Sequence, residues 1–301
     1  MSETRVESKP VGPGYLAESQ ATPPTGSEAA RSPAPITIGT IQKLAAQGEA
    51  FACLTCYDAT TAGWLERAGV PVLLVGDSAA NVILGLDRTS EIPLDFLITL
   101  TAAVKRGAPS TLVMADMPFM SYHADDAEGV RNAGRFLTEG KADLVKLEAD
   151  ASFAPLVEKM VRAGIPVCGH IGLLPQRVAL TGRYQAAGRT NEAIETLVRD
   201  AKALEEAGCC MLLVEAVPDE AADAVLAATD VPVIGIGAGE RVHGQILVIQ
   251  DLLGLSPRPP RFADPVARMG PELEAAGREW VGRVRARSIG GERYRMRKGS
   301  E

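Results

Sequence analysis

The sequence predicts an α/β protein that folds as a (β/α)8 TIM-type barrel, and three observations lead to this fold class. Short apolar runs alternate with longer amphipathic stretches from Ile36 to about residue 252. The apolar runs are too continuous for strands with one face in water, and strands covered on both faces have this composition. There are eight of them. Regular alternation of strand and helix indicates a parallel sheet, and eight units indicate a closed barrel rather than the alternative, a doubly wound open sheet.

The elements can be placed in chain order. Strands are predicted at Ala52–Tyr57, Pro71–Gly76, Thr111–Ala115, Leu144–Leu147, Ile165–Cys168, Met211–Val214, Val231–Ile236 and Gln245–Ile249. Helices are predicted at Ala59–Ala68, Leu94–Arg106, Ala127–Glu139, Phe153–Ala163, Asn191–Ala207 and Glu220–Ala227. The first five helices each end before a glycine, which is favoured just beyond a helix C-terminus. A repeated fragment, Arg-Ala-Gly-Val-Pro-Val at 67–72 and Arg-Ala-Gly-Ile-Pro-Val at 162–167, supports a repeating unit.

Three regions follow from the change in composition along the chain. Residues 1–35 are rich in Pro, Ser, Gly, Glu and Ala and contain almost no bulky apolar residue, which predicts a disordered tail. Residues 36–262 are expected to form the catalytic barrel. Residues 263–301 are expected to form a C-terminal extension with a helix at Pro271–Arg287 and a basic tail.

Composition and charge narrow the class of protein. The 301 residues carry a formal charge of −7, which disfavours a surface for nucleic acid or for anionic membranes. No apolar run approaches the roughly 20 residues of a membrane helix, and the N-terminus lacks the apolar segment of a secretory signal. The five cysteines are odd in number and lie mostly in apolar runs. They are expected to be reduced, buried thiols of a cytoplasmic protein.

Ionisable residues or glycines follow almost every predicted strand. In a barrel, the carboxyl ends of the strands and the loops after them form the active site. The residues at these places are Asp58, Asp77 with Ser78, Asp116, Lys146 with Glu148, His170, Glu215, the glycines of 235–239, and Asp251. A single acid after a strand is commonly only a helix N-cap, but a series of eight such ends favours a catalytic site.

Three of these carboxylates favour a hard divalent cation. Asp77, Asp116 and Glu148 would repel one another at one barrel mouth, and a few oxygen ligands with room for water and substrate suit Mg²⁺. Lys146 and Glu148 are two residues apart on a strand and therefore face the same way, although a purely structural Lys–Glu pair is the alternative. Mg²⁺ can chelate a 2-oxo acid and stabilise its enolate, while a nearby acid or base moves the proton.

Five longer motifs surround these residues. They are Leu74-Val-Gly-Asp-Ser78, Ala115-Asp-Met-Pro-Phe-Met-Ser-Tyr122, Val145-Lys-Leu-Glu148, Pro166-Val-Cys-Gly-His-Ile-Gly-Leu173 with Pro175-Gln176, and Val233-Ile-Gly-Ile-Gly-Ala-Gly239 with Gly244-Gln-Ile-Leu-Val248. With them the sequence resembles the ketopantoate hydroxymethyltransferase family of pantothenate biosynthesis, from Ile36 to about Phe262. The resemblance implies a (β/α)8 barrel, assembly as a homo-oligomer (a decamer in the family), and Mg²⁺ dependence.

The resemblance also implies a reaction and a role for each site residue. The family transfers a hydroxymethyl group from 5,10-methylenetetrahydrofolate to the enolate of 3-methyl-2-oxobutanoate, which gives 2-dehydropantoate (ketopantoate). The implied Mg²⁺ ligands are Asp77, Asp116 and Glu148. The implied contacts of the 2-oxo acid are Asp77, Ser78, Asp116 and Lys146. The implied catalytic residues are Glu215 as proton acceptor, Lys146 beside the enolate, and His170 in the same site.

Some loop residues depart from the family pattern and leave two alternatives open. Ala149 and Asp150, for example, stand where the family has two glycines after its Lys-x-Glu motif. A diverged aldolase or C–C lyase would use the same Mg²⁺-enolate chemistry on another 2-oxo acid. A non-catalytic relative would be expected to have lost ligands, whereas Asp77, Asp116 and Glu148 are all present here.

Overall fold

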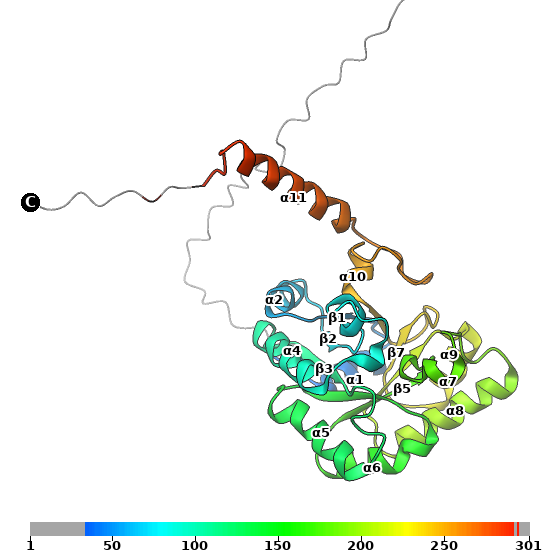
Figure 1. The fold of residues 1–301 in the computed structure, drawn as a ribbon. Coiled ribbons are helices and arrows are strands. Elements are labelled where there is room, and N and C mark those ends of the chain that lie inside the picture. The colour runs from blue at the N-terminus through cyan, green and yellow to red at the C-terminus, as the bar shows by residue number, and fades with distance from the viewer. Residues whose placement is uncertain (1–33, 292–293, 295–301) are drawn as a thin grey trace, which may run out of the picture. The chain divides into compact units, whose positions relative to one another are not determined.

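Eight parallel strands close into a barrel, as the sequence predicts (Figure 1). The computed structural model describes residues 34–291 and 294, so most of the predicted disordered tail, residues 1–33, lies outside the described residues. The strands are β1 Phe51–Thr55, β2 Val72–Val75, β3 Leu112–Asp116, β4 Leu144–Glu148, β5 Val167–Gly172, β6 Met211–Glu215, β7 Val233–Ile236 and β8 Gly244–Leu247. Each strand pairs with its neighbours in sequence, and β1 pairs with β8 to close the ring.

Helices cover the outside of this barrel (Figure 1). The helices between consecutive strands include α2 Ala59–Arg67, α4 Leu94–Gly107, α5 Asp126–Thr138, α6 Ala154–Arg162, α8 Asn191–Glu206 and α9 Asp219–Ala228. Each lies within two residues of its predicted bounds. Additional short helices that we did not predict are α3 Ala79–Val82, α7 Val178–Thr181 and α10 Ile249–Leu252, with 3-10 turns at Thr89–Glu91, Ala151–Phe153 and Pro175–Arg177.

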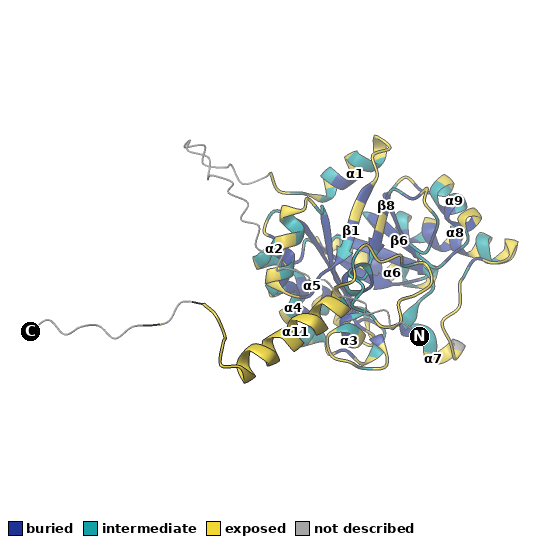
Figure 2. Ribbon diagram, turned by 90° about the horizontal axis from the view of Figure 1, so that it is seen from above, coloured by how far each residue is buried: buried dark blue, intermediate teal, exposed yellow. Residues whose placement is uncertain are grey.

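Both ends of the chain's described part are helical. The helix α1, Ile38–Ala46, precedes the first strand and was not predicted. Its Ile41 is fully buried and packs with the apolar side chains of the barrel interior. The C-terminal helix α11, Met269–Arg285, confirms the predicted helix, and its side chains from Pro271 onward are exposed along its whole length (Figure 2).

The largest error in the strand prediction is at β5. The predicted strand ends at Cys168, whereas the observed strand continues to Gly172 and stays paired with both β4 and β6. Glycine and histidine are not typical strand residues, so the apolar run ends before the strand does. As a result His170 lies within the strand, two residues after Cys168, and points to the same side as that buried thiol.

Alternation along the strands brings the polar residues to one end of the barrel interior. The interior side chains include Leu74, Met114, Leu144, Cys168 and Leu213. On the strands of Met114, Leu144, Cys168 and Leu213, the residues two positions further along are, in the same order, Asp116, Lys146, His170 and Glu215. Because side chains two apart share a face, these polar groups form the next layer above the apolar ones, at the carboxyl ends of the strands.

The structure also tests the expectations for membrane-spanning helices and for the cysteines. Within residues 34–291, no helix has the length and apolarity needed to span a membrane. All five cysteines are free thiols, four of them buried, as expected.

Candidate active site

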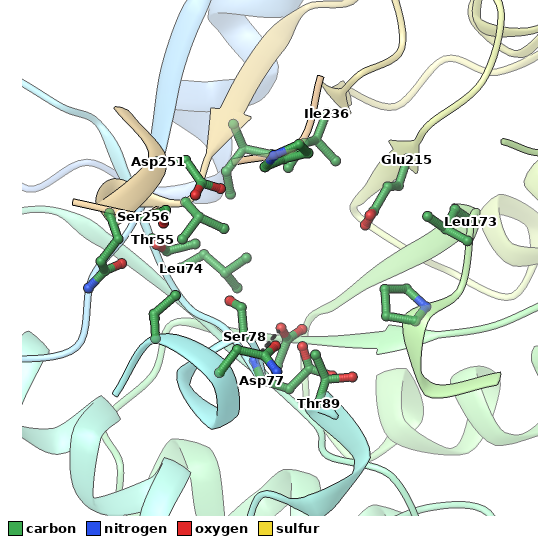
Figure 3. Close-up of a pocket in the computed structure, with 18 of the residues that line it drawn as sticks. Thr55, Leu74, Asp77, Ser78, Thr89, Leu173, Glu215, Ile236, Asp251 and Ser256 are labelled. Atoms are coloured by element: carbon green, nitrogen blue, oxygen red, sulfur yellow. Dashed lines mark hydrogen bonds between the residues drawn. The ribbon is translucent and has the colours of Figure 1, made fainter. Parts of the chain in front are cut away.

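One cavity of about 960 Å³ opens at the carboxyl ends of the strands, and every residue with a predicted catalytic, substrate-binding or metal-binding role lines it. Figure 3 shows Asp77, Ser78 and Glu215 among its lining residues. Asp77 and Ser78 follow β2, Asp116 ends β3, and Lys146 and Glu148 belong to β4. His170 lies in β5 and Glu215 ends β6. The residues of this set other than Ser78 and Glu215 are less than one-tenth exposed.

Asp116 links β2 to β4 at the bottom of the cavity. Its Oδ2 accepts a hydrogen bond from the backbone N–H of Asp77 at 3.0 Å, and its Oδ1 lies 2.6 Å from Lys146 Nζ. Burial opposes the charge of Lys146, but the carboxylates of Asp116 and Asp77 more than offset burial and raise the pKa of the ammonium well above its usual range. Lys146 is therefore a permanent cation at the floor of the site.

The turn after β2 leaves little room beside Ser78. A Cβ at Gly76 would lie 2.7 Å from Ser78 Oγ. A side chain here would therefore displace the Ser78 hydroxyl. Ser78 is held in turn by Tyr57, whose phenol oxygen lies 2.8 Å from the serine Oγ.

Gln176 joins two of the three carboxylates, and sequence reasoning assigned it no role. Its side-chain amide donates to Asp77 Oδ2 at 2.9 Å, and its backbone N–H donates to both oxygens of Glu148 at 3.1 Å. Tyr122 completes the connection by donating to the Gln176 Oε1 and to the Glu148 carbonyl. The only signal in the sequence is the Pro175-Gln176 pair within a family motif, because an isolated glutamine carries no pattern of its own.

His170 stands between Lys146 and Glu215. Its Nδ1 lies 3.3 Å from Lys146 Nζ, and its Nε2 lies 3.3 Å from Glu215 Oε2 without hydrogen-bond geometry. Burial and the charge of Lys146 hold the pKa of His170 well below its usual range. The ring is therefore neutral, and because Lys146 can only donate, we assign the ring proton to Nε2, on the side of Glu215.

A glycine also fixes the loop that follows His170. Gly172 has a φ of +96°, and a Cβ at this position would lie 2.4 Å from the carbonyl oxygen of Glu215. Only glycine fits at this point, where β5 and β6 approach each other.

The carboxylates hold more negative charge than their one cation balances. Burial and the charge of Asp116 raise the pKa of Asp77 to about 7, although Lys146 acts in the opposite direction. Burial and the charge of Asp77 raise the pKa of Glu148 to about 9. Burial and neighbouring carboxylates thus disfavour the ionised forms of Asp77 and Glu148, and a bound cation would favour them.

The donor set fits Mg²⁺ held by few protein ligands. Within the described residues, no three His, Cys, Asp or Glu side chains form a ready-made metal cage. Mg²⁺ usually binds through one or two carboxylates and keeps water or substrate oxygens, so a complete cage is not required. Asp77, Asp116 and Glu148 supply only oxygen ligands and line an open cavity, as this ion prefers.

Two of the other strand ends carry residues with structural roles. Asp58 is the N-cap of α2, accepts from the backbone N–H of Thr61 at 2.8 Å, and does not line the cavity. The glycines of 235–239 pack closely: a Cβ at Gly237 would meet the Phe262 ring and one at Gly239 would meet Asp219. Asp251, in contrast, does line the cavity.

Fold and site together define a (β/α)8-barrel enzyme with a buried acid–base cluster at the carboxyl ends of its strands. The family model described as ketopantoate hydroxymethyltransferase matches residues 35–291. The chain belongs to this family and is therefore a hydroxymethyltransferase.

Curated relatives agree with this assignment over most of their length. The chain is 44% identical to a 3-methyl-2-oxobutanoate hydroxymethyltransferase of Thermobifida fusca over 273 residues, which is 87% of this chain and 98% of the relative. It is 46% identical to the enzyme of the same name from Pyrobaculum aerophilum over 235 residues, covering 78% and 89% of the two chains.

Solved structures with lower sequence identity share the fold. A phosphonopyruvate hydrolase, solved with oxalate and Mg²⁺, has a TM-score of 0.57 at 14% identity and covers 83% of this chain and 88% of its own. A 2,3-dimethylmalate lyase has a TM-score of 0.56 at 17% identity and covers 86% and 88%.

The hydrogen bonds of Gln176 give a prediction for stability. Gln176→Met keeps the backbone N–H but removes the donor to Asp77 and leaves that buried carboxylate poorly paired. We expect the free energy of unfolding of the metal-free protein to fall by about 1–3 kcal/mol. Urea denaturation measures this loss, with the exposed Gln47→Met as the control. Equal stability of the two variants would show that the amide does not support Asp77.

Proposed function

We propose that the chain catalyses Mg²⁺-dependent transfer of a hydroxymethyl group from 5,10-methylenetetrahydrofolate to 3-methyl-2-oxobutanoate. The product is 2-dehydropantoate, the pathway is pantothenate biosynthesis, and the compartment is the cytoplasm. The observation that carries the proposal is that Lys146, the carboxylate cluster and Glu215 line one cavity. The names of the curated relatives supply the substrate.

The floor of the cavity suits a small 2-oxo acid. Lys146 is a permanent cation and can attract the substrate carboxylate or the negative charge of the enolate. The Ser78 hydroxyl is oriented by Tyr57 and can donate to a substrate oxygen. Leu74 and Leu213 also line the cavity and offer apolar contacts for the two methyl groups.

Asp77, Asp116 and Glu148 are the residues that would hold Mg²⁺. When bound there, the ion would act as a Lewis acid that makes the C3 proton of the 2-oxo acid more acidic. Gln176 contributes by holding Asp77 and Glu148 at a fixed separation, so that the carboxylates need not rearrange on binding.

Glu215 is the proposed proton acceptor. Burial raises its pKa to about 7, although the charge of Lys146 opposes the shift. A carboxylate with a pKa near neutrality can both take and return a proton efficiently. His170 is the positioning group, because its Nε2–H faces the Glu215 carboxylate while Lys146 fixes its Nδ1 as an acceptor.

The steps balance with one water molecule. Water first releases the one-carbon unit as formaldehyde: its oxygen bonds to the methylene carbon, both carbon–nitrogen bonds break, and its two hydrogens end on the two nitrogens of tetrahydrofolate. The C3 proton passes to Glu215, and C3 of the enolate attacks the formaldehyde carbon, whose carbonyl π electrons move to its oxygen. That oxygen then takes the proton back from Glu215 and becomes the new hydroxyl group.

The two residues beside Glu148 that depart from the family pattern do not favour a different lyase reaction. Ala149 and Asp150 do not line the cavity. Asp150 instead caps the 3-10 turn that follows it and forms an ion pair with Arg177 at 2.7 Å. The departures beside Glu148 therefore serve the local backbone.

The direct test is product formation from both proposed substrates. We expect purified protein to form 2-dehydropantoate from 3-methyl-2-oxobutanoate and methylenetetrahydrofolate with Mg²⁺. Addition of a chelator should abolish formation, and excess Mg²⁺ should restore it. Product formed equally well without metal would contradict the role of the carboxylate cluster, and absence of product under all conditions would contradict the reaction.

Replacement of Glu215 tests the proton acceptor. We expect Glu215→Gln to slow exchange of the C3 proton of 3-methyl-2-oxobutanoate for deuterium by ~100-fold or more. Because Glu215 must be deprotonated to act, exchange by the unmodified protein should rise about tenfold per pH unit below the pKa of about 7 and level off above it. Exposed Glu220→Gln is the control. A pH-independent rate, or full activity of Glu215→Gln, would contradict the assignment.

We also propose that the chain forms a homo-oligomer. Leu273, Trp280 and Val284 lie on one stripe of α11 and are exposed, which supports burial of this stripe against a second copy. Native mass spectrometry should give a multiple of 31.7 kDa, and Leu273→Asp should lower the assembled fraction, unlike Glu272→Gln. A mass of one chain would contradict the proposal.

A further inference from the structure

A buried carboxylate without a partner lines the wall of the cavity opposite the predicted metal site. Asp251 is 7% exposed, and within the described residues no hydrogen bond or ion pair reaches its side chain. Figure 3 shows it beside Thr55 and Ser256, apart from Asp77 and Glu215. The carboxylate opens into the cavity, so a ligand that displaces water there would have to supply hydrogen-bond donors to it.

The backbone around Asp251 holds the carboxylate in place. The N–H of Ile249, at the start of α10, donates to Thr55 Oγ1 at 3.0 Å and joins this helix to the end of β1. On the other side, the N–H groups of Leu255 and Ser256 both donate to the Gln250 carbonyl. The short helix is therefore held from both sides, and neither attachment uses the Asp251 carboxylate.

The cavity of about 960 Å³ is far larger than a five-carbon oxo acid requires. Its lining around α10 contains the apolar residues Ile246, Val248, Leu255, Pro257 and Phe262, together with the polar residues Gln250, Ser256 and Arg258. The apolar residues suit a flat ring, and the Asp251 carboxylate suits an edge of that ring with two adjacent donors.

We propose that Asp251 binds the pterin ring of the folate co-substrate, accepting two parallel hydrogen bonds from its 2-amino group and its N3–H. This inference rests on the proposed function, which requires a folate. A carboxylate has two acceptor oxygens whose geometry matches such an amidine-like edge, as it matches the fork of a guanidinium. The floor of the cavity, with Lys146 and the carboxylate cluster, remains for the 2-oxo acid.

The test compares Asp251→Asn with a matched variant of a surface carboxylate. Asp264→Asn removes the same charge from an exposed residue in the segment after α10 that does not line the cavity. We expect tetrahydrofolate to bind Asp251→Asn at least about tenfold more weakly than the unmodified protein in calorimetry, because a charged acceptor is lost. Asp264→Asn should bind it normally.

Two further readouts separate recognition of the ring from damage to the fold. An unpartnered buried carboxylate does not support the fold, so Asp251→Asn should unfold at the same temperature as the unmodified protein or a higher one. The unmodified protein should prefer 6-methylpterin to 6-methyllumazine, which has an oxygen in place of the 2-amino group. This preference should disappear in Asp251→Asn, whose amide can donate to that oxygen.

The outcomes distinguish this inference from the proposed function. Deuterium exchange at C3 of 3-methyl-2-oxobutanoate needs no folate and tests the metal and enolate chemistry by itself. If exchange occurs but tetrahydrofolate binds the unmodified protein and Asp251→Asn equally, or binds neither, the role of Asp251 is overturned. If exchange fails while tetrahydrofolate binding depends on Asp251, the enolate chemistry is overturned and the pterin site stands.

Discussion

The structure depends on one constraint: three carboxylates and one ammonium share a buried layer at the end of the barrel. The Lys146–Asp116 pair balances one negative charge, and Asp77 and Glu148 remain. Gln176 donates hydrogen bonds to both of these groups, but burial and repulsion between the carboxylates still raise the pKa values of Asp77 and Glu148. A further positive charge would therefore stabilise the ionised form of both carboxyl groups, which supports the proposed binding of Mg²⁺.

The same strand register that fills the barrel also forms this layer. Met114, Leu144 and Leu213 pack in the interior, and the next side chains on the same face are Asp116, Lys146 and Glu215. If one of these strands slipped by one residue, its polar side chain and its apolar interior side chain would both point out of the barrel. The strand register that buries the apolar side chains in the barrel therefore also fixes the positions of the polar groups.

The parts of this design that could be predicted from sequence are those that repeat. Eight apolar runs identified the barrel, and acids after the strands identified the cavity, because both follow from the period of a strand. Gln176 could not be found in this way: its role depends on Asp77, 99 positions away in the chain, and on a 3-10 turn without a periodic pattern. Asp58 illustrates the opposite case: the strand-end pattern included it among the candidates, but an acid after a strand can equally be a helix cap.

The two ends of the cavity differ in the way that a reaction between two substrates requires. Around Lys146, three carboxyl groups share one cation, which supports the proposed binding of a metal ion and of the oxygen atoms of a 2-oxo acid. Around Asp251, a carboxylate without a hydrogen-bond partner lies beside apolar residues and beside Gln250, Ser256 and Arg258, which supports the proposed binding of a ring with N–H donors. The proposed 2-oxo acid and pterin would therefore occupy different parts of one cavity, because each part offers groups that only one of them matches.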